Sequence, residues 1–394
     1  MRRPVARPTT RVLVVTSPPT PYRVPLFERI SRDPSIDLRV LFCAESEPTR
    51  PWRLEPFGFE HEFLKGVEIA VGREDRHSYF VNPGVLGALR RARYDVLVVW
   101  GWWQFASLVA ARHARWTRRP YVVFSETHSP LSRSGPRRWA RERLATSVVA
   151  GASAWLATGS LSRHHLLSLG AQDDGVFLFP NSPDVEALEA RARAARPKRD
   201  EIRRSLGVPP EGPVALFVGR FVEKKGLRLL LPAFRRALER VPDARLLLVG
   251  DGPMASEVRS LAATVGERVV LAGFAQPDRV HEAYVAADVL AIPSLDEPWG
   301  VVVNEAMACG VPVIASNAVG AAPDMIRDGE TGWVVPGGDE IALANALSAA
   351  LSDLPRLRGM ASACVSMARA WDHHLGARSF SAAIERAARV GSGR

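Results

Sequence analysis

The segment Asp288-Val-Leu-Ala-Ile-Pro293 precedes Glu297-Pro-Trp-Gly-Val-Val-Val-Asn-Glu305, so an apolar strand is followed at once by the start of a helix. Gly310 ends this helix, which we predict over 301–309. Gly300 leaves the first helical amides uncovered, so an anion can approach the positive end of the helix dipole while the two carboxylates bind hydroxyl groups. A phosphorylated sugar has both kinds of group, and we expect a ligand of this kind.

Short apolar runs alternate with amphipathic stretches along the whole chain, which is typical of parallel sheets covered by helices. The first series of predicted strands covers 11–16, 36–42, 95–100, 121–124, 154–157 and 176–179. The second series covers 214–218, 245–249, 269–272, 289–292, 311–315 and 333–335. Two series predict two open α/β sheets, with ligands at the carboxyl ends of the strands and a cleft between the domains.

The length of 394 residues and the 47% apolar composition suit two hydrophobic cores. We predict a first Rossmann-like domain over 1–190, which binds the acceptor, and a second over 191–370, which binds the donor. Residues 186–212 are rich in Ala and Arg and suggest the connection between them. The tail, 371–394, is predicted as a helix that packs back on the first domain.

Charge is distributed unevenly along the chain. Residues 1–200 contain 31 Lys and Arg against 20 Asp and Glu, a net +11, whereas residues 201–394 contain 21 against 22, a net −1. A basic first domain suits an anionic membrane face, an acceptor with a pyrophosphate, or nucleic acid. A solvated, Arg-rich surface is the alternative interpretation.

Targeting and cysteine signals are weak. Three widely spaced cysteines without a Cys-x-x-Cys motif argue against a disulfide framework and against a zinc site. The first apolar run, 12–15, is shorter than a signal segment, and no stretch approaches a membrane span. We therefore expect a cytoplasmic protein, with peripheral contact at the inner membrane face as a further possibility.

The loop Gly219-Arg220-Phe-Val-Glu-Lys224-Lys225-Gly226 follows the predicted strand 214–218. It offers two glycines and three cations at the carboxyl end of a strand, which suits a diphosphate. Arg220 can make bidentate, charge-assisted hydrogen bonds and Lys225 adds a point charge. A solvent-exposed basic loop is the alternative, but the two glutamates on a later strand favour the functional interpretation.

A second glycine-rich turn, Val249-Gly250-Asp251-Gly252-Pro253-Met-Ala255, matches a dinucleotide-binding fingerprint. A redox domain would place that fingerprint after its first strand, whereas this turn follows the second strand of its series. Nicotinamide binding is therefore disfavoured, and we predict a tight turn with Pro253 at the start of the next helix.

These motifs, taken in order, resemble the retaining glycosyltransferases of family 4, which have the GT-B fold of two facing Rossmann-like domains with a cleft between them. The resemblance covers most of the chain, and its combination of motifs is specific. The matching segments are 219–226, 248–253, 287–288, 293–294, 297–300, 304–308, 310–313 and 329–332, with 180–184 leading into the second domain.

The resemblance implies a set of roles at the site. Arg220 and Lys225, with Gly219 beside them, would hold the nucleotide diphosphate. Glu305 would bind the ribose hydroxyls, and Glu297 would contact the transferred sugar near its anomeric carbon.

Further residues complete the donor-binding set that the resemblance implies. The backbone amides of Gly300, Val301 and Val302 would assist at the diphosphate, and Phe274 and Trp299 belong to the same set. From the first domain, His128 would contact the transferred sugar.

The implied reaction moves a sugar from a nucleotide-diphosphate donor to a hydroxyl acceptor with retention of configuration, as in the glycosylation of bacterial-type glycans, glycolipids or natural products. The departing phosphate oxygen takes the acceptor proton on the same face. The absence of an Asp-x-Asp motif agrees with a site without metal or other cofactor. Two segments depart from the family pattern: 17–23 replaces a glycine pair, and Val319-Gly320 replaces a later one.

Four residues of the first domain are candidates for acceptor contact: Tyr22, Trp102, Trp103 and Glu126. Core packing is the alternative for the tryptophans. Residues 137–145 form a basic amphipathic helix that suits an anionic membrane, or else an ordinary solvated face. We expect no nucleic-acid partner.

Other functions are compatible with parts of the pattern. A GT-B phosphorylase or a nucleotide-sugar epimerase would keep the fold and change the chemistry. A non-catalytic protein that binds sugar nucleotides or a membrane surface is an alternative of another class, although the intact set of Arg220, Lys225, Glu297 and Glu305 argues against it. A hydrolase with an acid and a nucleophile among the paired glutamates is disfavoured, because the resemblance implies that Glu297 serves hydroxyl recognition and electrostatics.

Overall fold

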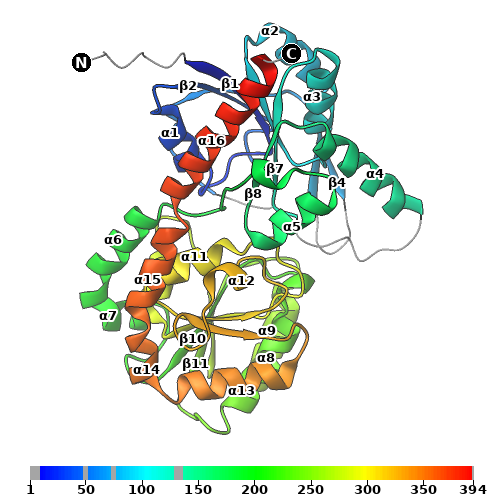
Figure 1. Cartoon of the computed structure of the whole chain (residues 1–394). Helices are drawn as coiled ribbons and strands as arrows, with labels where there is room; N and C mark the ends of the chain where they lie inside the picture. Colours follow the sequence, from blue (N-terminus) through cyan, green and yellow to red (C-terminus); the bar gives the residue numbers. More distant parts are fainter. Residues whose placement is uncertain (1–8, 48–51, 72–76, 128–135, 393–394) are drawn as a thin grey trace, which may run out of the picture. The chain divides into compact units, whose positions relative to one another are not determined.

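The computed structural model describes residues 9–47, 52–71, 77–127 and 136–392, and the chain divides into two compact units (Figure 1). Among these residues, unit 1 contains those up to Asn181 and those from His373 onward. Unit 2 contains Ser182–Asp372. Residue 190, the expected domain boundary, lies inside the helix α6 (Val185–Ala195) of unit 2.

Unit 1 contains a seven-stranded parallel sheet in the order β3-β2-β1-β6-β7-β8-β9. Its strands are β1 (Thr10–Thr16), β2 (Ile36–Phe42), β3 (Glu60–Phe63), β6 (Val96–Trp100), β7 (Tyr121–Ser125), β8 (Ala154–Ala157) and β9 (Val176–Leu178). Successive side chains of a strand point to opposite faces. Apolar residues at nearly every position therefore create one core on each face.

Helices cover the two faces of this sheet. Val12 and Val14 of β1 share a core with α1 (Val24–Ser31) and α16 (His373–Ser392). Leu13 and Val15 share the opposite core with α2 (Val85–Arg91), α3 (Phe105–Trp116) and α4 (Pro136–Ala150). The C-terminal helix α16 thus packs on the sheet of unit 1, where Phe380 and Ile384 are buried.

Three strands of unit 1 have no counterpart among the predicted ones. The edge strand β3 has charged residues in place of an apolar run, and its Glu60 and Glu62 form ion pairs with Arg39 of β2. The other two, β4 (Val67–Val71) and β5 (His77–Val81), form an antiparallel hairpin outside the main sheet. The side chains of β4 are exposed.

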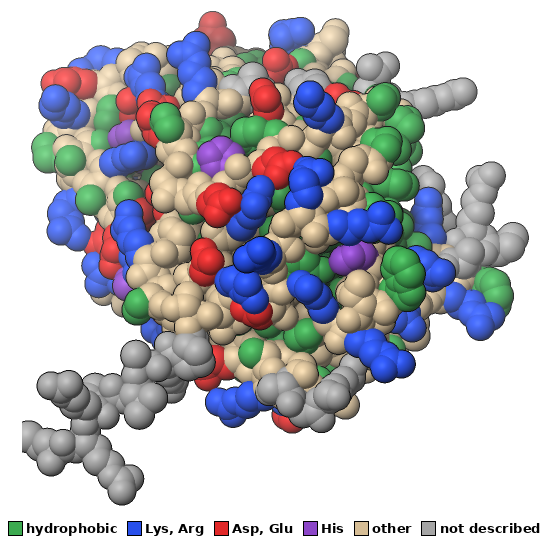
Figure 2. Space-filling view, turned by 90° about the horizontal axis from the view of Figure 1, so that it is seen from above, with side chains coloured by type: hydrophobic (Ala, Val, Ile, Leu, Met, Phe, Trp, Pro, Cys, Tyr) green, Lys and Arg blue, Asp and Glu red, His purple; other side chains and the backbone are tan. Residues whose placement is uncertain are grey.

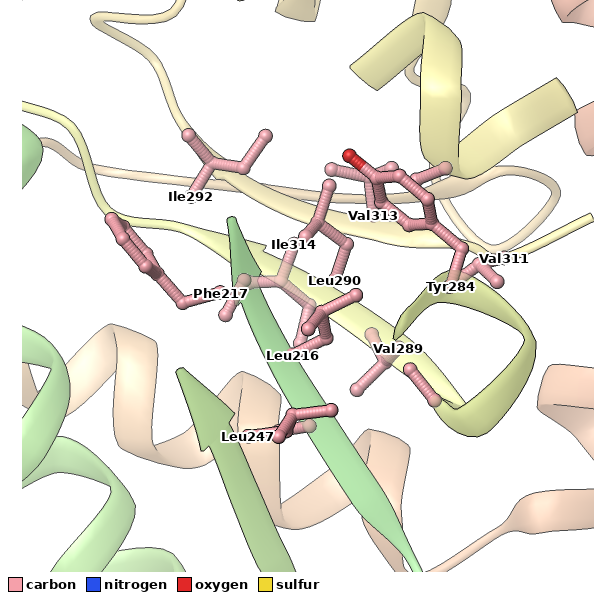
Figure 3. Close-up of a cluster of buried hydrophobic side chains, with 14 of the residues drawn as sticks. Leu216, Phe217, Leu247, Tyr284, Val289, Leu290, Ile292, Val311, Val313 and Ile314 are labelled. Carbon is pink, nitrogen blue, oxygen red and sulfur yellow. The ribbon is translucent and has the colours of Figure 1, made fainter. Parts of the chain in front are cut away.

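Unit 2 contains a six-stranded parallel sheet in the order β12-β11-β10-β13-β14-β15. Its strands are β10 (Val214–Val218), β11 (Arg245–Val249), β12 (Val269–Gly273), β13 (Val289–Ile292), β14 (Val313–Ser316) and β15 (Gly332–Val335). Figure 3 shows part of its core, with Leu216, Leu290 and Ile314 on neighbouring strands. Every predicted strand of the two series is present, with ends shifted by at most two residues.

The helices of unit 2 lie on both sides of this sheet (Figure 1). They are α6, α7 (Arg199–Ser205), α8 (Leu227–Ala237), α9 (Ala255–Val265), α10 (Val280–Ala286), α11 (Val301–Ala308), α12 (Ala322–Met325), α13 (Glu340–Leu351), α14 (Leu354–Gly359) and α15 (Ala361–Ala370). In the part of the chain that the structure describes, no helix is both long and apolar enough to cross a membrane.

The segment predicted as a connection folds into α6 and α7 and is fixed by a buried guanidinium. Arg203 is 2% exposed and donates to Asp288 Oδ2 at 2.9 Å, to the Ala286 oxygen at 2.8 Å and to the Pro210 oxygen at 2.7 Å. Burial lowers the pKa of Arg203, while Asp288 opposes this effect. Asp288 also accepts from the Val214 amide at 2.9 Å, so α7 is tied to the starts of β10 and β13.

Candidate active site

The basic loop 219–226 lies at the carboxyl end of β10 and is braced by the glycine-rich turn after β11. The Gly219 amide donates to the Val249 oxygen at 3.0 Å, and the Phe221 amide donates to the Asp251 oxygen at 2.8 Å. A Cβ at Gly250 would lie 1.9 Å from the Gly219 carbonyl oxygen. Only glycine fits there, so the turn after β11 serves to support the basic loop.

A second loop, 293–300 after β13, packs against the other end of the basic loop. The Leu295 amide donates to the Lys224 oxygen at 2.7 Å. Gly226 has φ +72°, and a Cβ there would lie 2.1 Å from the Pro293 carbonyl oxygen. The loops that follow β10 and β13 are therefore in backbone contact.

The loop after β14 holds the other side of the segment that carries Glu297. The Glu297 amide donates to the Ala318 oxygen at 3.2 Å, and the Gly320 amide donates to the Glu297 oxygen at 2.9 Å. A Cβ at Gly320 would lie 2.0 Å from the Pro298 carbonyl oxygen, so this position also requires glycine. The segment 319–320, where the chain departs from the family pattern, thus positions the backbone of Glu297.

These braced loops bring two predicted site residues into direct contact. Lys225 Nζ donates to Glu297 Oε2 in an ion pair whose side chains are 17% and 13% exposed. The effective dielectric constant is lower at such a partly buried pair than in water, so the attraction is stronger than at an exposed pair. Arg220 lies in the same loop as Lys225, so the cations and the carboxylate share one edge of the sheet.

The helix α11 starts directly behind this ion pair. Gly300 is its N-cap with φ +93°, no side chain caps the helix, and its first turn contains no acidic residue. Val301 and Val302, the first two helical residues, are partly exposed. A helix start of this kind favours an anion through its amides and its dipole.

Glu305, one turn further along α11, is held by a residue that sequence reasoning missed. The Tyr284 hydroxyl of α10 donates to Glu305 Oε2 at 2.6 Å. Burial raises the pKa of Glu305, and the hydrogen bond from Tyr284 opposes part of this rise. Tyr284 is fully buried in the core of unit 2 (Figure 3). A buried tyrosine hydroxyl usually has a hydrogen-bond partner, so a tyrosine within an apolar helix was the signal in the sequence that could have indicated this contact.

The two aromatic residues of the predicted donor-binding set differ in exposure. Trp299 is 2% exposed, its ring centre lies 5.4 Å from that of Trp371, and its Nε1 donates to Asn304 Oδ1 at 2.9 Å. The Trp299 side chain is therefore part of the core, and its predicted contact with a donor stays a prediction that the burial of the indole ring disfavours. Phe274, directly after β12, is 42% exposed and is accessible to a ligand.

In unit 1, Glu126 follows β7 and is held by two residues from distant segments. Asn181 Nδ2 donates to Glu126 Oε2 at 2.6 Å, and Arg23 Nη2 lies 3.3 Å from the same oxygen. The Arg23 side chain is only 6% exposed, and its guanidinium lies 4.9 Å from the Trp100 ring centre. Sequence reasoning missed Arg23 and Asn181, because only the fold brings them to Glu126.

Polar atoms gather at the carboxyl edge of the unit 1 sheet. The buried atoms Thr16 Oγ1, Trp100 Nε1, Thr158 Oγ1 and Arg23 Nε have no hydrogen-bond partner among the described residues. Strand register brings them together, since β1, β6, β7 and β8 are neighbours and each of the three strand residues lies at or just after a strand end. Buried polar groups normally have partners, so this edge is suited to a polar ligand or to water.

The other residues of the first domain that are predicted to contact the acceptor or the sugar differ in their exposure. Trp102 is 4% exposed within the core that includes α3, so its burial disfavours the predicted contact with an acceptor. Trp103 is 41% exposed, with the Arg141 guanidinium 5.3 Å from its ring centre. Tyr22 is partly exposed, and its ring centre lies 6.5 Å from that of Trp52. His128 lies outside the described residues.

Metal-ligating side chains do not cluster within the described ranges. No group of three or more His, Cys, Asp or Glu residues there is placed to hold a metal ion. The three cysteines are buried, and burial raises the pKa of Cys43 and of Cys364 to about 12.

Both units match known protein families. Residues 198–367 match the model of glycosyl transferases group 1, and residues 3–182 match that of a glycosyl transferase 4-like domain. The two matches together include both sheets and all of the loops described above. They agree with the resemblance that the motifs indicate.

Curated relatives are also glycosyltransferases. The D-inositol 3-phosphate glycosyltransferase of Actinosynnema mirum is 35% identical over 332 residues, which is 79% of this chain and 73% of that protein. The enzyme of the same name from Nocardia farcinica is 32% identical over 75% of this chain, and the match spans 63% of its own length. The 2-deoxystreptamine N-acetyl-D-glucosaminyltransferase of Streptomyces fradiae is 39% identical over 43% of this chain and 41% of that enzyme.

Solved structures share the fold at lower sequence identity. The Anabaena protein HepE in complex with UDP has a TM-score of 0.72 at 20% identity, over 94% of this chain and 98% of HepE. The sucrose-phosphate synthase of Thermosynechococcus elongatus has a TM-score of 0.73 at 21% identity, over 94% of this chain and 97% of that enzyme. The chain therefore has the GT-B fold and belongs to the group 1, family 4-type glycosyltransferases.

Proposed function

We propose that this protein is a retaining glycosyltransferase that transfers a hexose from a nucleotide-diphosphate donor to a hydroxyl acceptor without a bound metal or other cofactor. The observation that supports this proposal is the Lys225–Glu297 ion pair beside Arg220 and in front of the uncapped start of α11. This arrangement offers cations, amides and a carboxylate within one set of braced loops. Those groups match the diphosphate and the hydroxyls of a sugar nucleotide.

Each group has a defined task in the reaction. The bond between the anomeric carbon and the departing phosphate oxygen breaks while the acceptor oxygen bonds to that carbon on the same face. Arg220, Lys225 and the first amides of α11 stabilise the negative charge that grows on the leaving diphosphate. The phosphate oxygen takes the acceptor proton, and Glu297 orients the sugar through its hydroxyls.

Glu305 has a separate task in donor binding. Its carboxylate accepts hydrogen bonds from the ribose hydroxyls, and Tyr284 keeps it in position from the core side. Phe274 contributes an exposed aromatic surface near the same strand ends.

The acceptor is proposed to be a small polyhydroxylated ring. D-inositol 3-phosphate and 2-deoxystreptamine stand in the names of the relatives, and both carry several hydroxyl groups on one ring. Glu126, fixed by Arg23 and Asn181, presents a 39% exposed carboxylate side chain that accepts hydrogen bonds from such hydroxyls. UDP-glucose, which HepE binds, is the first donor to test, with UDP as the matching nucleotide ligand.

A thermal-shift panel of nucleoside diphosphates and nucleotide sugars tests donor use first. A ligand at about 100 times its dissociation constant adds about 2.7 kcal/mol to stability, which gives a clear shift. The selected donor is then offered with inositol and aminocyclitol acceptors, and NMR reads the anomeric configuration of the product. Retention and full activity after treatment with EDTA are expected, whereas an inverted product contradicts the proposal.

Two variants distinguish the site from the rest of unit 2. Glu297→Gln is expected to lose at least about 100-fold in turnover, because it removes a charge beside the reacting centre. Glu340→Gln is the matched control, since Glu340 forms a surface ion pair with Arg236 on other helices. Unchanged turnover in folded Glu297→Gln, or donor conversion that needs no acceptor, contradicts the assignment.

A further inference from the structure

A pocket of about 450 Å³ lies in unit 1, at the loops that follow β1 and β2 and along the edge strand β3. The carboxylates of Glu45, Glu47 and Glu55 line it, whereas its described lining residues include no Lys or Arg. This volume suits a small organic molecule. Ligands of open parallel sheets bind at the carboxyl ends of the strands, so the pocket lies where a ligand is expected.

The acidic lining of the pocket contrasts with the charge around it. Residues 1–200 have a net charge of +11, and Figure 2 shows Lys and Arg side chains distributed widely over one face of the molecule. Glu45 and Glu55 are exposed, and neither forms an ion pair or a side-chain hydrogen bond with another described residue. These two carboxylates are therefore available to an external cation.

Aromatic rings line the same pocket. Phe57 is stacked on Phe59 with ring centres 5.6 Å apart, and its ring centre lies 4.9 Å from that of His61. Trp52 and Phe63 are further lining residues, and the side chains of Trp52 and Phe57 are partly exposed. The faces of aromatic rings attract cations, so the rings and the carboxylates favour the same kind of ligand.

Most polar side chains of the lining accept hydrogen bonds. Ionised carboxylates have no proton to donate. His61 Nδ1 donates to the Phe59 carbonyl oxygen at 2.9 Å, because a carbonyl can only accept, so Nε2 of a neutral His61 ring is an acceptor as well. A complementary ligand therefore carries positively charged N–H donors.

An organic cation fits these groups better than a metal ion or an anion. No three His, Cys, Asp or Glu side chains among the described residues are placed to hold one metal ion, so the three carboxylates do not converge on a point. Carboxylates that are spread around a pocket suit positive charges that a carbon framework holds apart. A phosphate group is disfavoured, because like charges repel.

The pocket is connected to the residues that we propose for acceptor binding. The Trp52 ring centre lies 6.5 Å from that of Tyr22. The Arg23 guanidinium lies 5.4 Å from the Tyr22 ring centre, and its Nη2 lies 3.3 Å from Glu126 Oε2. Arg23 is thus engaged with Glu126, while Tyr22 separates it from the ring that lines the pocket.

The segment after β1 also brings buried hydroxyl groups to the border of the pocket. Pro19 lines the pocket, and its neighbour Thr20 is 5% exposed. Thr20 Oγ1, like Thr16 Oγ1 at the end of β1, has no hydrogen-bond partner among the described residues. Buried hydroxyls normally have partners, so these two groups are suited to a polar ligand or to water.

We propose that this pocket binds the ammonium groups of an amino-substituted, polyhydroxylated ring, so that the acceptor is an aminocyclitol or an amino sugar. This inference rests on the proposed function and names its acceptor class. The carboxylates of Glu45 and Glu55 bind the ammonium groups, and the Trp52 and Phe57 rings pack beside them. A protonated amine has no free electron pair, so a ring hydroxyl attacks the anomeric carbon and its proton passes to the departing phosphate oxygen.

Calorimetric titration of the full chain with three six-membered rings of different charge tests this proposal. The probes are 2-deoxystreptamine with its ammonium groups, uncharged myo-inositol and anionic myo-inositol 1-phosphate. We expect 2-deoxystreptamine to bind at least about tenfold more tightly than inositol, with a difference that declines as salt increases, and the phosphate to bind most weakly. Equal affinities, tightest binding of the phosphate or no binding of 2-deoxystreptamine overturns the proposal.

Substitutions locate the binding in the pocket. Glu45→Gln and Glu55→Gln are each expected to weaken the binding of 2-deoxystreptamine about threefold and together about tenfold, and Trp52→Leu about threefold. Asp37→Asn is the matched control for charge, because Asp37 is exposed near the amino end of β2, whereas the pocket lies beyond its carboxyl end. Trp116→Leu is the control for the ring, since Trp116 is 74% exposed on α3. An equal loss in the pocket variants and the controls overturns the assignment.

Two further measurements separate this inference from the proposed function. Di-N-acetylated 2-deoxystreptamine keeps the ring without its charge and is expected to bind the unchanged chain and the Glu45→Gln, Glu55→Gln double variant alike. Transfer assays with the selected nucleotide sugar then use the same three rings. Transfer to inositol together with equal affinities for all three rings overturns the acceptor class and leaves the proposed function intact. Tight binding of 2-deoxystreptamine that depends on both glutamates, without transfer from any donor, supports the pocket and contradicts the proposed function.

Discussion

Replacing Tyr284 by Phe removes one hydroxyl and tests how Glu305 is held. Phenylalanine keeps the ring and its packing in the core, so the change isolates the 2.6 Å hydrogen bond to Glu305 Oε2. A hydrogen bond to a charged group contributes about 1.5–3 kcal/mol, against about 0.5–1.5 kcal/mol between neutral groups. The hydroxyl therefore favours the carboxylate over the protonated form by about 1–1.5 kcal/mol.

This preference predicts a definite dependence on pH. Burial already raises the pKa of Glu305, and loss of the opposing hydrogen bond raises it further. Because the ribose is proposed to bind the carboxylate, donor affinity falls as the pH falls through this pKa, and in Tyr284→Phe the fall begins at higher pH. Below both pKa values the variant binds about five- to tenfold more weakly, since about 1.4 kcal/mol corresponds to tenfold. Above both values the two proteins bind alike.

Calorimetric titration of the preferred nucleoside diphosphate over a pH series measures this ratio. The ligand's own ionisation affects both proteins equally, so it cancels in the ratio of the dissociation constants. Tyr121→Phe is the matched control, because the Tyr121 hydroxyl donates to the Val148 oxygen at 2.6 Å in the buried core of unit 1. A ratio that is constant with pH, or that grows as the pH rises, refutes the role of Tyr284 in maintaining the charge of Glu305.

Three further substitutions address the fold of the site. Arg203→Met leaves Asp288 without its most deeply buried partner and is expected to destabilise unit 2 by about 3–5 kcal/mol, as measured by denaturant-dependent hydrogen exchange. Gly226→Ala forces a Cβ to within 2.1 Å of a carbonyl oxygen and is expected to weaken donor binding at least tenfold, whereas Gly338→Ala, at φ +82° with open space around it, is expected to leave it unchanged. Arg23→Met removes one of the two groups that hold Glu126 and is expected to raise the KM for the acceptor without a change in donor affinity.

Each of these expectations has an outcome that contradicts it. Arg228 is an exposed arginine in an ion pair of unit 2, so a loss of stability in Arg228→Met equal to that of Arg203→Met would deny the special role of burial. Equal donor affinity in the two glycine variants would show that close packing at position 226 does not shape the basic loop. An increase in the donor dissociation constant of Arg23→Met would place Arg23 in donor binding.

The elements that sequence predicted well are those whose signal is local. Apolar runs identified the central strands. The ordered motifs identified the loop 219–226 and the loop and helix start at 297–305, because the residues of each motif are close together in the sequence. Strand β3 was not predicted, since its charged side chains make ion pairs with Arg39 instead of forming an apolar run. The hairpin strand β4 was missed because its apolar side chains are exposed and lie outside the main sheet.

Contacts between distant segments could not be read from the chain. Tyr284 and Glu305 are 21 residues apart, and Arg23 and Glu126 are 103 residues apart, so only the folded sheet shows that they meet. The sequence also does not indicate which of two adjacent tryptophans is buried. Trp102 is 4% exposed and Trp103 is 41% exposed, because consecutive residues point in different directions from the loop before α3.

The uneven charge of the chain now has a structural interpretation. The loops that we propose to bind the donor lie in unit 2, yet residues 201–394 have a net charge of −1, so the domain as a whole does not attract an anionic nucleotide. We therefore propose that capture of the diphosphate depends on oriented groups at short range, namely Arg220, Lys225 and the first amides of α11. The excess of arginines lies instead in the segment 85–155, which contains 12 Arg and three acidic residues. A charge that served donor capture would be expected beside the proposed donor loops, so this basic excess does not serve it.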